Sequence, residues 1–159
     1  GPFRGPYLGQ APPGRSPVLF APEFFLDPGE YHSPIVSSPD GTEAYWSPMP
    51  GHGRNTTLRT RMVDGVWTKP EHVDFAVEAG ATEVAYSPDG GMIYFLSTQQ
   101  LEGEEPTEGP GERIWFTTRD SDDTVGTPQL MPRAVTAHFT HRQFSVAGWA
   151  GYLFLDALF

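Results

Sequence analysis

The tetrapeptide Ser38-Pro39-Asp40-Gly41 occurs again 49 residues later as Ser87-Pro88-Asp89-Gly90. An aromatic pair follows each copy at the same offset, Tyr45-Trp46 after the first copy and Tyr94-Phe95 after the second. In such a turn proline fixes φ, aspartate accepts hydrogen bonds from nearby backbone N–H groups, and glycine takes a positive φ. The pattern therefore predicts two equivalent tight hairpins, in which Asp40, Gly41, Asp89 and Gly90 are structural turn residues.

The repeat extends beyond these turns. A weaker third copy begins at Ser145, 58 residues after the second, and is followed by Tyr152-Leu153-Phe154. Downstream of the aromatic pairs, residues 58–61 align with 114–117 at an offset of 56, and residues 68–70 align with 126–128 at an offset of 58. Self-similarity over such distances is typical of repeat architectures. The alignment predicts an insertion of seven residues in the second repeat, and of two more before its last segment.

Each repeat contains four short runs rich in β-branched and aromatic residues, separated by turn residues. The predicted strands cover residues 35–38, 43–47, 58–63, 66–73, 83–87, 92–97, 113–119 and 124–131. No window of helical length has a clean 3.6-residue period, although residues 131–144 are ambiguous, so the predicted fold class is all-β. Repeats of this length with four antiparallel strands are typical of β-propeller blades.

The Ser-Pro-Asp-Gly turn followed by an aromatic strand resembles the WD40-like repeat of TolB-type β-propellers. Tyr7-Leu8-Gly9-Gln10, Pro12-Pro13-Gly14 and Phe20-Ala21-Pro22 resemble the segment that leads into some bacterial propellers of this group. The resemblance covers residues 7–154. It implies a propeller fold and a bacterial periplasmic or other extracytoplasmic setting, and it implies no activity, because the repeat occurs in binding proteins and in non-catalytic parts of peptidases.

The predicted domain organisation is a leader over residues 1–16 and a partial propeller over 17–159. Within it we expect complete blades at residues 31–75 and 81–131 and partial blades at 17–26 and 141–155. Propellers typically have four to eight blades, so this number cannot close a ring without further sheets. We expect a homodimer to complete a six-bladed ring, and the alternative is that the chain is a fragment of a longer propeller. The expected interface residues are Leu19, Phe20, Tyr152, Leu153, Phe154 and Leu155.

Composition excludes several classes of function. The 159 residues include 10 Lys and Arg against 20 Asp and Glu, a formal charge of −10, which repels nucleic acid. No stretch approaches 18 consecutive apolar residues, so no membrane-spanning helix is expected. Cysteine is absent, which excludes disulfides and thiol chemistry.

No catalytic or metal-binding motif is present. The five histidines form no His-Glu-x-x-His pattern, and no Gly-x-Ser-x-Gly elbow occurs. We therefore expect no enzyme activity, no metal site and no cofactor. The alternative is a hydrolase or lyase with Tyr31, His32 or His141 at the mouth of a propeller channel, and these three residues are candidate binding residues in either case.

One segment carries most of the negative charge. Residues 102–123 contain eight acidic residues and only two arginines, which gives −6 of the net −10. Glu102, Glu104, Glu105 and Glu108 are candidate contacts for a basic protein or a weakly bound Ca²⁺ ion. The alternative is a solvated loop that maintains solubility. The sequence as a whole predicts a non-enzymatic protein- or peptide-binding or scaffold module that associates with itself through its terminal strands.

Overall fold

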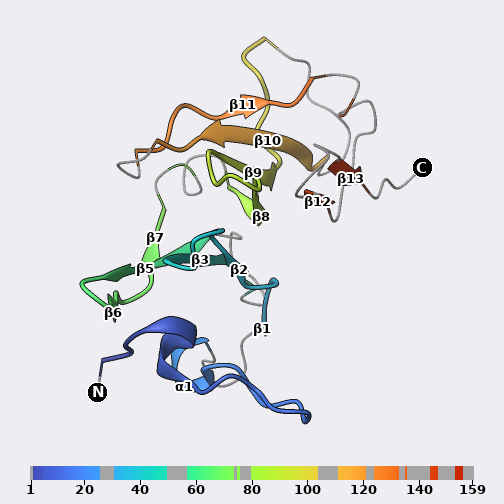
Figure 1. Ribbon diagram of the computed structural model, residues 1–159. Helices are drawn as coiled ribbons and strands as arrows, with labels where there is room; N and C mark the ends of the chain where they lie inside the picture. The colour runs from blue at the N-terminus through green and yellow to red at the C-terminus, as the bar shows by residue number, and fades with distance from the viewer. Residues whose placement is uncertain are drawn as a thin grey trace.

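A computed structural model describes residues 2–25, 31–49, 57–73, 75, 80–103, 111–120, 124–132, 135, 144–146 and 153–155. Over these residues the protein is mostly β, with antiparallel sheets of five and four strands and one short α-helix. The N-terminal segment, the five-stranded sheet and the four-stranded sheet lie one on another in the order of the sequence (Figure 1). The prediction of a β fold is thus confirmed at the level of a mostly β structure. Neither sheet is closed or curled among the described residues, so the propeller ring stays a prediction.

Sheet 1, the five-stranded sheet, contains the first Ser-Pro-Asp-Gly turn between its first two strands. Its strands are β2 (Val36–Ser37), β3 (Glu43–Trp46), β5 (Leu58–Val63), β6 (Val66–Trp67) and β7 (Glu71–His72), and both β6 and β7 pair with β5. The strand predicted at 66–73 is thus two short strands interrupted by residues 68–70. A small separate pair, β1 (Tyr31–His32) with β4 (Pro48–Met49), was not predicted.

Sheet 2, the four-stranded sheet, contains the second copy of the turn. Its strands are β8 (Thr82–Tyr86), β9 (Met92–Ser97), β10 (Arg113–Thr118) and β11 (Gln129–Leu130), paired in that order. A third hairpin, β12 (Phe144–Val146) with β13 (Leu153–Leu155), forms its own two-stranded sheet, and its strand β12 contacts β8. It lies where the weaker third repeat was expected.

The two turns have the same hydrogen bonds. Ser38 Oγ donates to Asp40 Oδ1 and Ser87 Oγ donates to Asp89 Oδ1, both at 2.6 Å. The N–H of Gly41 donates to the carbonyl of Ser38, and the N–H of Gly90 to the carbonyl of Ser87, both at 2.9 Å. Gly41 and Gly90 have φ values of +71° and +75°, which glycine adopts without strain. The prediction of two equivalent structural turns is confirmed.

Strand pairing corrects the alignment downstream of the turns. Tyr45 pairs with Arg59 in sheet 1, and its counterpart Tyr94 pairs with Phe116 in sheet 2, so the structural offset here is 57 and not 56. The N–H of Met62 donates to Thr42 O and the N–H of Arg119 donates to Gly91 O, which supports the same offset. The second repeat therefore inserts eight residues rather than seven, and one further residue before its last segment rather than two.

Alternate side chains of β3 face different layers, as expected for a strand buried on both sides. The Tyr45 ring lies 5.6 Å from that of Tyr86 in sheet 2, whereas the Trp46 ring lies 4.8 Å from that of Phe25 in the N-terminal segment. The core between the sheets consists of Tyr45, Val73, Phe75, Ala81, Val84, Tyr86, Ile93, Phe95 and Trp115. A second core lies between sheet 1 and the N-terminal segment and consists of Leu8, Ala21, Phe25, Trp46 and Trp67.

The N-terminal segment is not organised as predicted. The partial blade expected at residues 17–26 is wrong over its described part, which contains the single-turn helix α1 (Pro22–Phe25) and no strand. Instead, residues 3–5 run along the outer strand β6: the N–H of Gly5 donates to Gly65 O and the N–H of Trp67 donates to Phe3 O, each at 3.0 Å. The leader expected to precede the fold is therefore part of it.

No helix among the described residues is both long enough and apolar enough to cross a membrane.

Candidate binding site

The Tyr7-Leu8-Gly9-Gln10 motif forms the turn η1 (Pro6–Gly9), which has an unusual backbone. Tyr7 and Leu8 both have φ of +54°, in the left-handed region, where a non-glycine residue costs roughly 1–2 kcal/mol. Gly9 has φ of +80°, and a Cβ there would lie 2.9 Å from the carbonyl oxygen of Arg4, so this position requires glycine. The burial of the Leu8 side chain in the core against sheet 1 holds the backbone in this strained conformation.

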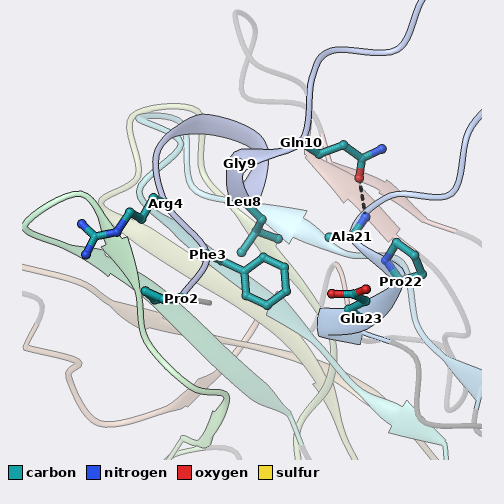
Figure 2. A pocket seen from close by; sticks show the side chains of 9 residues that line it. All are labelled: Pro2, Phe3, Arg4, Leu8, Gly9, Gln10, Ala21, Pro22 and Glu23. Carbon is teal, nitrogen blue, oxygen red and sulfur yellow. Dashed lines mark hydrogen bonds between the residues drawn. The ribbon is translucent and has the colours of Figure 1, made fainter.

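The side chain of Gln10 closes the loop that follows. Its Oε1 accepts a hydrogen bond from the N–H of Ala21 at 2.6 Å (Figure 2). Its Nε2 donates to Leu19 O at 3.0 Å. The Gln10 side-chain amide thus bonds the backbone N–H of Ala21 and the backbone carbonyl of Leu19, as a neighbouring strand would. Ala21 also has a left-handed φ, of +38°, and Pro22 then begins helix α1.

Two cavities adjoin this strained segment and share Leu8 as a wall residue. The first has a volume of about 560 Å³ and lies between residues 2–4 and the start of α1. In Figure 2 the side chains of Phe3 and Leu8 point into the space between these segments, whereas the Arg4 guanidinium points away from it. Glu23 lies at the opposite wall and is exposed.

The second cavity, which we call the aromatic cavity, lies between the N-terminal segment and sheet 1. It has a volume of about 350 Å³. Its wall is mostly apolar, and it includes Tyr7 and Phe20, whose exposed fractions are 57% and 41%. Large aromatic side chains that remain exposed beside a cavity are typical of binding surfaces. The apolar wall residues on the sheet are Ile35, Ala44, Met62 and Trp67.

Asp40 is the one charged residue among the described residues that line the aromatic cavity. Its Oδ1 accepts hydrogen bonds from Ser38 Oγ at 2.6 Å, from Thr42 N–H at 3.0 Å and from Thr42 Oγ1 at 2.7 Å. The bond from the Ser38 hydroxyl, followed by those from Thr42, lowers the pKa of Asp40 to about 2. The carboxylate is therefore ionised at any physiological pH.

A second cluster of polar groups lies between the two sheets, around the buried carboxylate of Glu43. Tyr45 Oη donates to Oε1 at 3.2 Å and Tyr86 Oη donates to Oε2 at 2.7 Å. Arg59 Nη1 lies 3.5 Å from Oε1, and Arg119 Nη2 lies 3.1 Å from Oε2. Each carboxylate oxygen is thus bound by one phenol and one guanidinium, and two of these four groups come from the other sheet or its edge.

The geometry of this Glu43 cluster favours a structural role. The Glu43 side chain is only 2% exposed, so a substrate cannot reach it in this conformation. Burial raises the pKa of both Tyr45 and Tyr86, so both phenols stay protonated and act as donors to the carboxylate. Arg59 also bonds to Glu71, at 2.9 Å, which extends the cluster to the protein surface.

The candidate residues for a channel site have side chains outside the described part of the structure, so this site stays a prediction. Tyr31 and His32 lie on β1, whose backbone pairs with β4, and their side chains are outside the described part of the structure. His141 is also outside it, as are Glu104, Glu105 and Glu108. Glu102 is described and exposed. Within the described ranges no three His, Cys, Asp or Glu side chains converge in a way that could hold a metal ion.

The expected interface residues are divided between the two ends of the stack. Leu19 is 71% exposed and Phe20 lines the aromatic cavity. Leu153, Phe154 and Leu155 form β13, and Tyr152 lies outside the described residues.

Sequence reasoning missed the Glu43 cluster and the exposed position of Tyr7. A signal for the cluster existed. Glu43 corresponds in the repeat to the apolar Met92, and it lies two residues before Tyr45 on the same strand, so both side chains face inward. A charged residue at an inward position of one repeat predicts a charged partner in the sheet it faces. The sequence could not identify Arg119 as this partner, because Arg119 corresponds to Met62 only at the corrected offset of 57.

No family model, no curated protein and no solved structure matches this chain. The resemblance to TolB-type propellers therefore stays a prediction from the repeated turn and its aromatic strand.

Proposed function

We propose that this chain is a non-enzymatic module that binds a segment of protein or peptide at the aromatic cavity. The observation that carries the proposal is the combination of the cavity of about 350 Å³ with two aromatic side chains, Tyr7 and Phe20, exposed at its wall. Left-handed, strained residues that the surrounding fold maintains are found disproportionately at binding sites, and Tyr7 and Leu8 are such residues here.

Binding is better supported than catalysis by the side chains around the cavity. Among the described residues of its wall, only Ser37 and Tyr7 carry a hydroxyl, and no histidine lies there to act as a base. Glu43, a buried carboxylate beside two tyrosines of raised pKa, is enclosed by four partners. A module that presents a shaped apolar wall and one fixed charge can hold a ligand but has no group placed to transform it.

We further propose that the two sheets are successive blades of a TolB-type propeller and that another copy of the chain covers the far face of sheet 2. On that face the buried pair Leu96 and Ile114 is followed along the strands by Tyr94 and Phe116, which are only half-buried. An apolar face that becomes exposed along its length is a suitable contact for a further sheet. Light scattering over a range of concentrations should then give twice the monomer mass of 17.5 kDa, and a monomer at every concentration would contradict this part.

Peptide display tests the binding function directly. Immobilised protein is used to select from a random peptide library, and the selected peptides are measured against wild type, Phe20→Ser and Val18→Ser. Val18 is a matched control because it is 58% exposed and lines neither cavity. We expect Phe20→Ser to weaken binding and Val18→Ser to leave it unchanged. Failure to select any peptide, or an equal loss in both variants, would contradict the proposal.

A further inference from the structure

The aromatic cavity exists because sheet 1 lacks two bulky side chains that sheet 2 has at corresponding positions. Ser37 pairs with Ala44 as Tyr86 pairs with Ile93, so Ser37 corresponds to Tyr86. The N–H of Met62 donates to Thr42 O as the N–H of Arg119 donates to Gly91 O, so Met62 corresponds to Arg119. In sheet 2 the long side chains of Tyr86 and Arg119 reach back to Glu43 and fill the space between the layers. In sheet 1 the same places hold Ser37 and Met62, and both line the cavity.

The chemistry of the open space differs from that of the filled one. Between the sheets, the fixed carboxylate is that of Glu43 in sheet 1, and Arg119, which pairs with it, comes from the edge of sheet 2. In the aromatic cavity the carboxylate is that of Asp40, in the turn of sheet 1, and the described residues of the wall include no cationic side chain. Arg119, whose positive charge also lowers the pKa of Asp40, has its Nη2 bound to Glu43.

Two further features favour a ligand that carries a positive charge on an apolar stem. The wall residues other than Ser37 and Asp40 are apolar or aromatic, apart from the glycine of the turn, so they suit methylene groups. The rings of Tyr7 and Phe20 can contact a cation through their faces. The net charge of the chain, −10, attracts basic partners and repels acidic ones.

We propose that the aromatic cavity binds the arginine or lysine side chain of an extended basic segment of a partner protein. The stem packs against the apolar wall, and the cationic group pairs with the Asp40 carboxylate. This inference rests on the proposed peptide-binding function and specifies the chemistry of the ligand. The volume of about 350 Å³ lies near the lower end of the ~300–1,000 Å³ of ligand pockets, which suits one long side chain with its adjoining backbone.

The test uses three fluorescent heptapeptides that have the same flanking leucines and differ only in a central arginine, citrulline or glutamate. Citrulline has nearly the shape of arginine without the charge. We expect the arginine peptide to bind roughly tenfold more tightly than the citrulline peptide, and the glutamate peptide not to bind, because a charge-assisted pair is lost or reversed. Raising the salt concentration from about 0.05 to about 0.5 M should weaken only the arginine peptide.

The variants Asp40→Asn and Asp89→Asn separate recognition from folding. Both remove the carboxylate of a Ser-Pro-Asp-Gly turn that has the same serine hydrogen bond, but only Asp40 lines the cavity. We expect Asp40→Asn to bind the arginine and citrulline peptides equally, and Asp89→Asn to retain the wild-type preference. If wild type binds arginine and citrulline peptides equally and Phe20→Ser weakens both, this inference is wrong and the binding function stands. If no peptide binds, both fail.

Discussion

The Nη2 atom of Arg119, at the edge of sheet 2, lies 3.1 Å from Oε2 of Glu43 in sheet 1. This ion pair joins the two repeats through side chains that the repeat does not share, since the corresponding residues are Met62 and Met92. A charge buried on one sheet is stable only against a sheet that supplies its partner. The pair therefore makes the two faces of this junction specific for one another.

Removing the charge of Glu43 should be costly. In Glu43→Gln the guanidinium groups of Arg59 and Arg119 lose a buried counter-charge, and we expect a decrease of about 2–3 kcal/mol in the free energy of unfolding. The control is Glu71→Gln, which also loses a contact with Arg59 but at an exposed position, and it should cost less than about 1 kcal/mol. Urea denaturation measures both. Equal losses would show that the buried carboxylate of Glu43 contributes no more to the free energy of unfolding than the exposed one of Glu71.

Replacing both partners should restore part of the loss. Glu43→Met and Arg119→Met each introduce the residue that the other repeat has at that position, and each alone leaves a charge without its main partner. We expect the double variant to be more stable than the sum of the single losses predicts, by at least about 1 kcal/mol. Additive losses in such a double-mutant cycle would exclude direct coupling across the junction.

The turn at Asp40 should make stability depend on acid pH. Its pKa in the folded protein is about 2, against an ordinary 3.8, so the carboxylate stabilises the fold above about pH 4 and this contribution is lost as the pH falls towards 2. Because the side chain is exposed, the contribution is about 1 kcal/mol or less. Unfolding measured between pH 6 and pH 2 should show a shallower decline for Asp40→Asn than for wild type. Identical slopes would contradict this account of the turn.

The left-handed turn of the N-terminal segment should depend on Gly9. In Gly9→Ala the new Cβ would lie 2.9 Å from Arg4 O at a φ of +80°, so the backbone must shift, at a cost of roughly 2 kcal/mol. The matched control is Gly14→Ala, where no atom lies within 4 Å of the added Cβ. Hydrogen exchange at the Trp67 amide, which donates to Phe3 O, reports the detachment of residues 3–5. It should accelerate in Gly9→Ala and stay unchanged in the control.

The sequence predicted the repeated elements well because their determinants are local. The Ser-Pro-Asp-Gly turns depend on bonds between neighbours, and the strands Leu58–Val63 and Met92–Ser97 have the predicted bounds. Where no turn motif fixed the register, the offset was wrong by one residue, because similar residue types at positions 114–117 can be aligned in more than one way.

The N-terminal segment was harder to predict because its structure depends on distant contacts. A partial blade was expected over residues 17–26, but the N–H of Ala21 bonds to the side chain of Gln10 rather than to a neighbouring strand. The candidate site was missed for the same reason. Nothing local in Ser37 or Met62 signals a cavity, which becomes evident only when these residues are compared with Tyr86 and Arg119 in the stacked repeat.

The most direct test of the central claim, that the chain binds peptide segments at the aromatic cavity, is backbone amide NMR of the labelled protein titrated with the arginine heptapeptide. The account predicts chemical-shift changes concentrated at Tyr7, Leu8, Phe20, Asp40 and Gly41, with little change along β9 and β10. Shift changes concentrated on β9 and β10, or no change at saturating peptide, would contradict it.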